Sequence, residues 1–491
     1  MLILSIFVFS TLISYSQIQK NYLISQGYSL YGESIAPSDN HCCLLVCTAD
    51  SSMNYQEGFI EPLYIFKVDQ FGDSLWMRTI EISNLKSVHK IRKTDSGDYI
   101  ILAESHSSQI VLIRINAEGE KIWEKRFNAL YDIGFWVMDL IVANNGDYLI
   151  TGWDLDSDYM MRPYLLRTNK EGNQLWYRDD YTADLIDVSS RSLVEDADNN
   201  IYLAGHLDPL TGGGSWDHDV CITKTDSDGN LIWQKTFDGP LNMNQPDYAE
   251  NIIISSDHHL LITGQSYVDG MGYVTHFFKI DLDGNVLQKE QYSNGEINGL
   301  SIKESNDHSL YIAGRGFDPS LSDSYVNSII KLNKNGQLIW SQFYANYTAI
   351  NDYTIVRGDA KDIYLFSDEK WMSVGDITFG ESLEIDGSYI APHSLYIITP
   401  DINLSSHSTI ALSKEVEVFP NPCHELLNII FTDAKAGEVQ LIDIHGRICK
   451  QLVVGSDIKK LVWNISDLKP GVYVLKTIMG KDIQLKKVLI Q

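Results

Sequence analysis

Short apolar runs, separated by polar turns that contain Gly, recur along most of this chain. One recurring unit is an apolar strand, then Asp or Asn, a Gly three positions later, and an apolar residue before Trp. It occupies residues 68–76, 115–123, 168–176, 225–233 and 332–340, and a sixth copy at 280–288 ends in Gln instead of Trp. Short strands that return about every 50 residues predict small sheets repeated around a β-propeller.

A second recurring unit is a turn followed by an apolar strand that ends in a small residue. It occupies residues 97–103, 146–152, 200–205, 259–264, 309–314 and 362–366, and residues 41–48 match it without the Gly. These seven copies predict a seven-bladed β-propeller over residues 17–403. The last unit lacks its final strand, and residues 20–24 read as such a strand. We therefore expect the N-terminal segment to complete the last blade, because closure removes exposed strand edges.

The repeated side chains also indicate how the blades are built. The Gly of each Asp-x-x-Gly turn is expected to supply the positive φ that a tight hairpin requires, and the Trp to pack as a wedge between blades. The repeat resembles a broad family of secreted bacterial propellers, and its spacing is similar to the tryptophan-docking repeat of quinoprotein-type propellers. These resemblances imply an architecture and leave the activity open, because one propeller fold hosts many activities.

The C-terminal segment, residues 415–491, has a different pattern and follows a Ser-containing linker at 404–414. Short apolar strands at 426–431, 438–444, 461–465 and 471–477 predict a small β-sandwich. Its order of motifs resembles the type IX secretion (Por) sorting domain, type A, of Bacteroidetes. The residues that carry this resemblance are Phe419, Pro420, Asn421, Pro422, Asp443, Gly446, Arg447, Leu468, Gly471, Tyr473, Lys486 and Lys487. The resemblance implies that the export machinery reads this domain and then removes it, so the protein is expected to be secreted or bound to the cell surface.

The N-terminus has the pattern of an export signal. Residues 2–13 are apolar and are followed by Ser-Tyr-Ser-Gln, which predicts a signal peptide over 1–16 with cleavage after Ser16. The apolar run is too short to span a bilayer as a helix.

Charge and cysteine content narrow the range of partners. The formal net charge is −27, and residues 415–491 hold ten Lys or Arg against nine Asp or Glu, so the excess acidity belongs to the propeller segment. A surface this acidic argues against binding nucleic acid. Cys42, Cys43 and Cys47 lie in one apolar strand and are expected to be buried hydrophobes. Cys423 and Cys449 are a candidate disulfide pair.

The sequence contains no recognisable catalytic constellation. Residues 226–230 and 281–285 look like the start of calcium loops, but the twelfth positions are Phe237 and Tyr292 where an EF-hand needs a carboxylate. The segments 217–219 and 258–259 contain His and Asp, and we interpret them as surface residues. The few Arg residues are scattered and no Arg cluster stands out. We expect no catalytic residue, no metal and no cofactor.

The longest insertions, residues 207–219, 238–247 and 316–325, are candidate binding loops, because loops often carry function. Trp153, Trp216 and Tyr325 are the candidate aromatic residues for stacking on a ligand. The first hypothesis is a monomeric, non-enzymatic propeller that binds a glycan or protein outside the cell. The alternative is a propeller enzyme, either glycan-cleaving or quinoprotein-like. Two carboxylates and an Arg cluster in the central funnel would favour it. A structural adhesin is a third possibility.

Overall fold

A computed structural model describes the chain in ranges that leave out its N-terminus and many connections. They are 17–22, 29–50, 60–128, 134–181, 187–208, 218–239, 245–293, 295–317, 325–344, 357–378, 383–385, 388–390, 393–400, 417–419, 426–430, 437–443, 448–455, 460–466, 468–469, 471–479 and 482–490. The chain divides into two compact units, Met1–Asn403 and Leu404–Gln491. Among the described residues, no helix is long and apolar enough to cross a membrane. The predicted signal peptide lies outside them.

The first unit is built from antiparallel sheets whose strands follow one another along the chain. Sheet 1 contains β2 (Ser29–Pro37), β3 (Cys43–Asp50), β4 (Ile60–Val68) and β5 (Ser74–Ser83). Sheet 2 contains β6 (Leu85–Lys93), β7 (Tyr99–Ser105), β8 (Gln109–Ile115) and β9 (Lys121–Asn128). Sheet 3 contains β10 (Phe135–Val142), β11 (Tyr148–Leu155), β12 (Met161–Thr168) and β13 (Gln174–Arg178).

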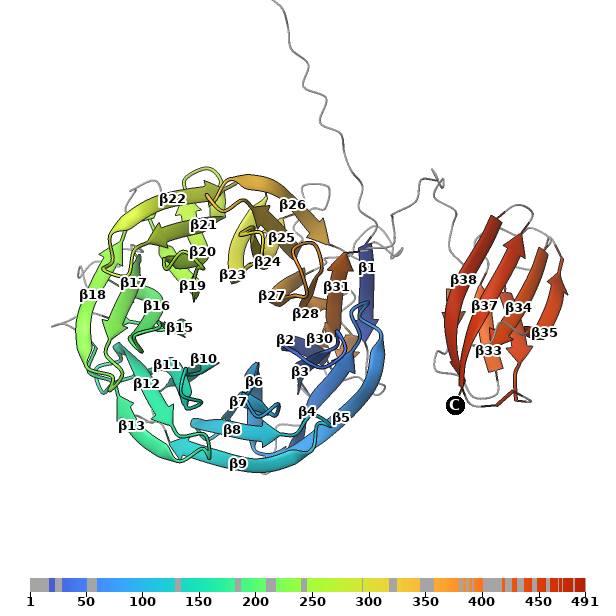
Figure 1. Ribbon diagram of the computed structural model, residues 1–491, viewed down its shortest axis with the longest axis horizontal. Coiled ribbons are helices and arrows are strands. Elements are labelled where there is room, and N and C mark those ends of the chain that lie inside the picture. Colours follow the sequence, from blue (N-terminus) through green and yellow to red (C-terminus); the bar gives the residue numbers. More distant parts are fainter. Residues whose placement is uncertain are drawn as a thin grey trace, which may run out of the picture. The chain divides into compact units, whose positions relative to one another are not determined.

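The next two sheets repeat this order. In sheet 4, β14 (Asp187–Val188) and β15 (Ser192–Glu195) both pair with β16 (Ile201–Asp208), which is followed by β17 (Asp219–Thr225) and β18 (Leu231–Phe237). Sheet 5 contains β19 (Asp247–Ile254), β20 (Leu260–Val268), β21 (Gly272–Ile280) and β22 (Val286–Tyr292). Figure 1 shows the sheets around a common centre, with β6, β10, β15 and β19 toward the centre and β9, β13, β18 and β22 at the rim.

The remaining strands of this unit form one eight-stranded sheet. One half contains β23 (Glu296–Glu304), β24 (Leu310–Phe317), β25 (Tyr325–Leu332) and β26 (Leu338–Tyr344). The other half contains β27 (Arg357–Leu365), β28 (Trp371–Thr378), β31 (His393–Pro400) and β1 (Gln17–Tyr22). A single parallel pair, Tyr325 with Arg357, joins the halves. Two short strands, β29 (Leu383–Ile385) and β30 (Ser388–Ile390), form a separate hairpin.

The N-terminal strand pairs with the last strand of this unit, as the sequence predicted. β1 runs antiparallel to β31, from Gln17 opposite Pro400 to Tyr22 opposite Leu395. The two ends of a segment of almost 400 residues are therefore joined by backbone hydrogen bonds, and the outer edge of β31 is covered.

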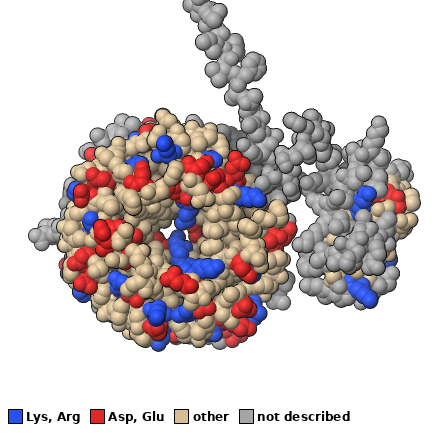
Figure 2. All heavy atoms as spheres, viewed as in Figure 1, with Lys and Arg blue, Asp and Glu red and all other residues tan. Residues whose placement is uncertain are grey.

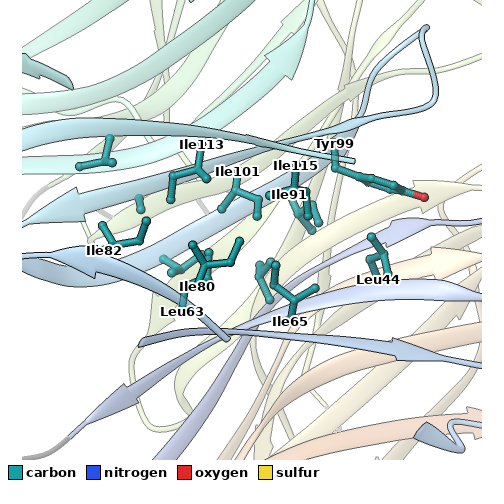
Figure 3. Packing of buried hydrophobic residues seen from close by; sticks show 14 of the residues in the cluster. Leu44, Leu63, Ile65, Ile80, Ile82, Ile91, Tyr99, Ile101, Ile113 and Ile115 are labelled. Carbon is teal, nitrogen blue, oxygen red and sulfur yellow. The ribbon is translucent and has the colours of Figure 1, made fainter. Parts of the chain in front are cut away.

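Apolar side chains from neighbouring sheets make the core. One cluster takes Leu44, Ile65 and Ile82 from sheet 1 and Ile101 and Ile113 from sheet 2, all of them buried. Figure 3 shows these side chains meeting between the two sheets. Both faces of β7 are buried because each sheet packs between two others, so this strand is buried along its whole length and shows no alternation.

The repeated Trp packs onto the next sheet, which confirms its predicted role as a wedge. Added Cβ atoms would lie 2.9 Å from Trp76 at Gly119 and 2.7 Å from Trp123 at Gly172. Each turn Gly therefore sits beneath the Trp of the preceding sheet. These glycines also have the predicted positive φ, with +80° at Gly119 and +77° at Gly172. The turn thus requires Gly for both its conformation and its contact.

The innermost strands carry a bulge that the sequence analysis did not predict. The strand register shifts between Val137 and Asp139 in β10, and at the matching places in β2, β6, β19, β23 and β27. The bulge brings the inner backbone close to the second strand. A Cβ on Gly264 would lie 1.8 Å from the carbonyl oxygen of Tyr248. This close approach explains why the repeated second strand ends in a small residue.

One copy of the repeat was misplaced by the sequence analysis. Residues 362–366 were read as a second strand, but Asp362 lies in the innermost strand β27, at the bulge. The second strand of that group is β28, where Gly375 is the small residue, with a hypothetical Cβ 1.8 Å from the carbonyl oxygen of Asp359. The segment Asp-Ile-Tyr-Leu matches the apolar pattern because the inner strand is buried at Asp362 and Ile363 and half-buried at Tyr364 and Leu365.

The second unit contains two sheets. One has β32 (Glu417–Phe419), β33 (Leu426–Ile430) and β36 (Lys460–Asn464), and the other has β35 (Ile448–Val454), β34 (Gly437–Asp443), β37 (Gly471–Met479) and β38 (Asp482–Ile490). A single apolar cluster includes Leu427 and Trp463 from the first sheet and Leu441 and Leu475 from the second. Strands β35 and β38 were not among the predicted ones.

Candidate ligand-binding site

The two ends of the first unit differ in their connections. In each meander, the turns after the first and third strands are short, such as Thr94–Gly97 and Asn116–Gly119, each closed by a backbone hydrogen bond. The other connections lie at the opposite end of the antiparallel sheet and include the long insertions. We call this end the loop face. Most of the insertions at 207–219, 238–247 and 316–325 lie outside the described residues.

An aromatic pair lies on the loop face of sheet 3. The rings of Trp136, from the start of β10, and Trp153, from the end of β11, stack with centroids 3.8 Å apart at 16°. The Trp136 side chain remains 36% exposed. The sequence analysis named Trp153 but missed Trp136, which precedes the inner-strand bulge at the position that Tyr31 and Tyr248 occupy in β2 and β19. A stacked, partly exposed indole pair can bind a flat apolar surface such as the face of a sugar ring.

Tyr325 lies on the loop face of another sheet, at the start of β25. Its ring is 40% exposed, and the guanidinium of Arg315 lies 5.6 Å from the ring centroid. Arg315 is held by the carboxylate of Asp359 through its Nε and Nη2 groups. The structure therefore does not bring Tyr325 together with Trp153, since they belong to different sheets that are not neighbours. Trp216 lies outside the described residues.

Sheets 4 and 5 share a second aromatic cluster on the loop face. The His206 ring lies 5.3 Å from that of His218 and 4.8 Å from that of Tyr248. His206 is buried, and Ser189 Oγ lies 2.8 Å from its Nδ1. Burial lowers the pKa of His206, and the Arg191 charge adds to that effect, so the ring is neutral at physiological pH. His218, read from the sequence as a surface residue, is instead part of this cluster.

A belt of polar side chains runs around the centre of the first unit at the level of the bulges. We define the polar belt as Ser34, Arg92, Asp139, Ser192, Asn251, Ser301 and Asp362, each from a different innermost strand. Apart from Arg92, its members are buried. Each bulge leaves a backbone N–H of its own strand without a partner in the ladder. Belt side chains from the neighbouring innermost strand accept such N–H groups. Asn251 Oδ1, for example, accepts the Ile302 N–H at 2.9 Å.

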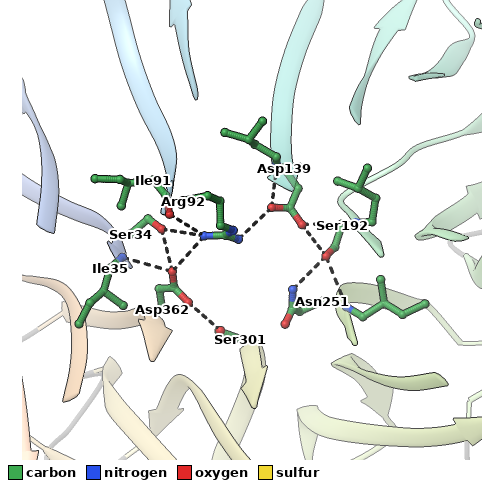
Figure 4. Close-up of polar contacts among 12 residues, drawn as sticks. Ser34, Ile35, Ile91, Arg92, Asp139, Ser192, Asn251, Ser301 and Asp362 are labelled. Atoms are coloured by element: carbon green, nitrogen blue, oxygen red, sulfur yellow. Dashed lines mark hydrogen bonds and ion pairs between the residues drawn. The ribbon is translucent and has the colours of Figure 1, made fainter. Parts of the chain in front are cut away.

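Hydrogen bonds connect the belt from strand to strand, as Figure 4 shows for most of its members. Ser192 Oγ donates to Asp139 Oδ2 at 2.7 Å and accepts from Asn251 Nδ2 at 2.9 Å. Arg92 donates to Asp139 Oδ1 and to Ser34 Oγ, both at 3.3 Å. On the far side, Asp362 accepts from Ser34 Oγ at 2.7 Å and from Ser301 Oγ at 3.0 Å. With the Asn251–Ile302 bond, the belt links every innermost strand to the next.

Basic side chains gather at the centre beside this belt. Lys303, Lys90 and Arg92 all act on the Asp362 carboxylate. Burial raises the pKa of Asp362, but these three cations together bring it well below its usual range. These three residues are scattered in the sequence and come together only through the fold. The cluster holds a single Arg, so it does not contradict the expectation that no Arg cluster exists. Lys90 and Lys303 come from β6 and β23, which are not neighbouring strands, and they approach one another only across the centre.

Further ion pairs surround this cluster. Arg191 Nη1 lies 3.1 Å from Glu250 Oε2, and Lys361 Nζ lies 2.9 Å from Glu33 Oε1. Figure 2 shows an opening at the centre of the ring that is lined by Lys or Arg side chains, although acidic side chains are spread over the visible face.

The segments that looked like calcium loops are hairpin turns, as interpreted. Asp226 Oδ1 accepts the N–H groups of Asp228 and Asn230 at 2.9 and 2.8 Å, and Asp281 does the same within its own turn. These carboxylates therefore stabilise their own turns by accepting backbone N–H groups. Within the described ranges, no group of three or more His, Cys, Asp or Glu residues is arranged to hold a metal ion.

The contacts of the other candidate residues in the first unit are also explained by a structural role. His258 has a positive φ of 61° in a turn of the repeat, and His259 Nδ1 lies 3.0 Å from Asp257 Oδ1. Cys42, Cys43 and Cys47 are buried thiols, as predicted, and burial raises the pKa of each. Cys423 lies outside the described residues, so its pairing with Cys449 stays a prediction.

The motif residues of the second unit fall at strand ends and in the core. Leu468 packs against the apolar cluster, and the buried Tyr473 donates its hydroxyl to the Lys469 carbonyl at 2.9 Å. Phe419, Asp443, Gly471, Lys486 and Lys487 lie on strands β32, β34, β37 and β38. Pro420, Asn421, Pro422, Gly446 and Arg447 lie outside the described residues.

Comparison with solved structures finds only distant likeness. A protein of unknown function from Dyadobacter fermentans is 7% identical, with a TM-score of 0.44, over 79% of this chain and 99% of its own. A protein of unknown function from Bacteroides caccae is 12% identical, with a TM-score of 0.37, over 65% and 94%. A polysaccharide lyase described as an ulvan lyase is 8% identical, with a TM-score of 0.47, over 78% and 98%. These similarities carry no argument about the activity of this chain.

The C-terminal unit, in contrast, has a specific match. No curated protein matches the chain, but residues 417–491 match the family model described as a secretion system C-terminal sorting domain. This match agrees with the motif order and with the two-sheet unit that contains them. The chain therefore carries a C-terminal sorting domain of the type IX secretion system, which marks it as exported cargo of that system.

Proposed function

We propose that the protein is a secreted or surface-attached, seven-bladed β-propeller that binds a glycan or protein ligand on its loop face. The blade count treats the two halves of the eight-stranded sheet as separate blades, because only the Tyr325–Arg357 pair joins them. Sheets 1 to 5 and these two halves then make seven. The pairing of β1 with β31 supports ring closure by the N-terminal strand. The propeller spans residues 17–403.

The second part of the proposal concerns export. Residues 1–16 are the signal peptide, 404–414 the linker, and 415–491 a β-sandwich that the outer-membrane machinery recognises. Export is tested by truncating the chain after Asn403 in a bacterium that has the type IX system. The truncated ring should accumulate in the periplasm, and the full chain should reach the surface or the medium. A truncated ring that still reaches the surface refutes this part.

Ligand binding on the loop face is supported above all by the Trp136–Trp153 stack. The buried Trp153 indole N–H has no hydrogen-bond partner among the described residues, and its stacking partner Trp136 is open to solvent. A glycan can stack the face of a sugar ring on the exposed part of this pair. Aromatic stacking surfaces of this kind contribute about 1 kcal/mol or more per contact.

A glycan array on the mature protein tests this site directly. We expect a hit whose signal is lost in Trp136→Ala. The matched control is Leu175→Ala, which removes a 53% exposed side chain from β13 of the same sheet. Equal loss in both variants, or a hit that is insensitive to Trp136→Ala, refutes binding at this stack.

A propeller enzyme is the alternative, and one observation favours it. Asp139, Asp362 and Arg92 meet at the centre, which matches the carboxylate-and-arginine arrangement expected of a catalytic funnel. The hydrogen bonds argue against it, because both carboxylates are held by Ser hydroxyls and backbone N–H groups. Moreover, the nearby cations keep Asp362 ionised, and it has no proton to donate. An activity screen on acidic and neutral polysaccharides, with Asp139→Asn as the inactive control, decides between the two.

A further inference from the structure

The central basic side chains are not all neutralised by the protein itself. Arg92, Arg191 and Lys361 each have a carboxylate partner. Within the described part of the chain, the ammonium groups of Lys90 and Lys303 have neither a hydrogen bond nor an ion pair at contact distance; their charges act on Asp362 only from farther away.

The belt carboxylates cannot serve these two lysines, because their acceptor positions are occupied. Asp362 Oδ2 accepts from Ser34 Oγ at 2.7 Å and from the Ile35 N–H at 3.3 Å. Its Oδ1 accepts from Ser301 Oγ and from the Ile363 N–H, both at 3.0 Å. A carboxylate has about four lone-pair sites, so Asp362 is saturated by neutral donors.

Asp139, the other belt carboxylate, is saturated in the same way. Its Oδ1 accepts the Leu140 N–H at 2.8 Å and Arg92 at 3.3 Å. Its Oδ2 accepts from Ser192 Oγ at 2.7 Å and from the Leu193 N–H at 3.3 Å. Lys90 and Lys303, on the innermost strands β6 and β23, therefore have ammonium donors that no belt oxygen can accept.

Without a bound ligand, this grouping of buried positive charges is energetically unfavourable. Burial lowers the pKa of Lys303, Asp362 opposes the effect, and Arg92 and Lys90 add to it by like-charge repulsion. Lys90, Arg92 and Lys303 lie together at the centre, although the net charge of the chain is −27. A polyatomic anion between the lysines would supply the missing acceptors and relieve the repulsion.

We infer that Lys90 and Lys303, with Arg92 beside them, form an oxyanion-binding site in the central opening of the ring, and that the ligand is an acidic glycan bearing sulfate or carboxylate groups. This inference rests on the proposed function for the glycan part and deepens it. An extended acidic glycan would place one anionic group on the ring axis and a neighbouring sugar on the loop face.

The test uses the mature full chain and matched probes. Dextran sulfate and unmodified dextran share a backbone and differ in charge, and sodium sulfate against sodium chloride at equal ionic strength tests the bare anion. We expect the protein to bind dextran sulfate and to show a higher thermal midpoint in sulfate. The double variant Lys90→Gln/Lys303→Gln should weaken dextran sulfate binding at least tenfold, because a hydrogen bond to a charged group contributes about 1.5–3 kcal/mol.

The control is Lys170→Gln/Lys334→Gln, which removes the same charge from two exposed turn residues. It should bind dextran sulfate like the wild type. If both double variants lose affinity equally, attraction is nonspecific and the site is refuted. Without anion the central variant should lose some stability, because Lys90 and Lys303 help to hold the buried Asp362 carboxylate in its ionised form. Its thermal midpoint should no longer respond to sulfate, and an equal response to sulfate in the variant and the wild type would overturn the inference.

The two proposals can fail separately. If Trp136→Ala abolishes a glycan-array hit and the central variant does not change binding of dextran sulfate or sulfate, the loop-face proposal stands and the central site is refuted. If inorganic sulfate raises the thermal midpoint only when Lys90 and Lys303 are present, but no glycan binds, the oxyanion site stands and its glycan assignment is overturned.

Discussion

Asp154 is a buried carboxyl whose replacement should stabilise the ring above neutral pH. It lies on β11, its side chain is fully buried, and neither oxygen makes a hydrogen bond to another described residue. Burial raises its pKa from 3.8 to about 7, and the charge of Asp179 adds to the effect. In Asp154→Asn the neutral amide has nearly the shape of the protonated carboxyl but does not ionise.

The sign and size of the expected change in the free energy of unfolding follow from the difference between the pKa of Asp154 in the folded and the unfolded protein. Between pH 4 and pH 7 the folded protein holds a proton at Asp154 that the unfolded chain has lost, so this group destabilises the fold as pH rises. Each pKa unit corresponds to about 1.4 kcal/mol. The advantage of Asp154→Asn should therefore grow from about 2 kcal/mol at pH 5 to about 4 kcal/mol at pH 8, as an upper bound.

The assay is the thermal midpoint of the mature protein at several pH values between 4 and 8, followed by tryptophan fluorescence. The difference between variant and wild type isolates this group, because buried histidines and other titrating residues contribute to both proteins. Asp158→Asn is the matched control, since Asp158 is exposed in the next turn. A difference that stays constant across this pH range, or that matches the control, would refute a neutral buried Asp154.

Three further predictions concern the stability of the ring. Gly264→Ala should destabilise it by several kcal/mol in thermal unfolding, because the new Cβ would meet a backbone oxygen at 1.8 Å. Gly455→Ala, in the second unit and with open space around it, should leave the stability of both units unchanged. Deleting residues 17–22 should lower the thermal midpoint and produce aggregates in size-exclusion chromatography, because β31 would keep β28 but lose the partner on its outer edge; unchanged behaviour would contradict closure. Asp362→Ala should cost about 3–5 kcal/mol in denaturant unfolding, since four donors and nearby cations lose their acceptor; a loss below 1 kcal/mol would mean that the belt is dispensable.

The sequence predicted those parts of the fold whose chemistry is local. The Asp-x-x-Gly turns were recognisable because the Asp side chain caps its own turn, as Asp226 does, and because the Gly must accept both a positive φ and the neighbouring Trp. The tail was recognised by its motifs in the same way, and the family match confirms it.

The polar belt and the basic cluster depend on contacts that no local pattern records. Ser34 and Asp362 are 328 positions apart, and the bulge residues have no common residue type, as His89, Met138 and Lys361 illustrate. The apolar pattern around Asp362 even led to an assignment to the wrong strand. Lys90 and Lys303 appeared as scattered charges because only the ring brings them close enough to act on one another.

The antiparallel pairing of β1 with β31 also determines when the fold can be completed. The first strand must wait for a partner that the ribosome makes almost 400 residues later, and closing so long a loop carries an entropic cost that slows folding. Until then the N-terminal strand is an unpaired segment and the opposite end of the array an open edge. Closure by β1 and β31 is therefore the last step in forming this array of sheets, because it requires both ends of the segment to be present.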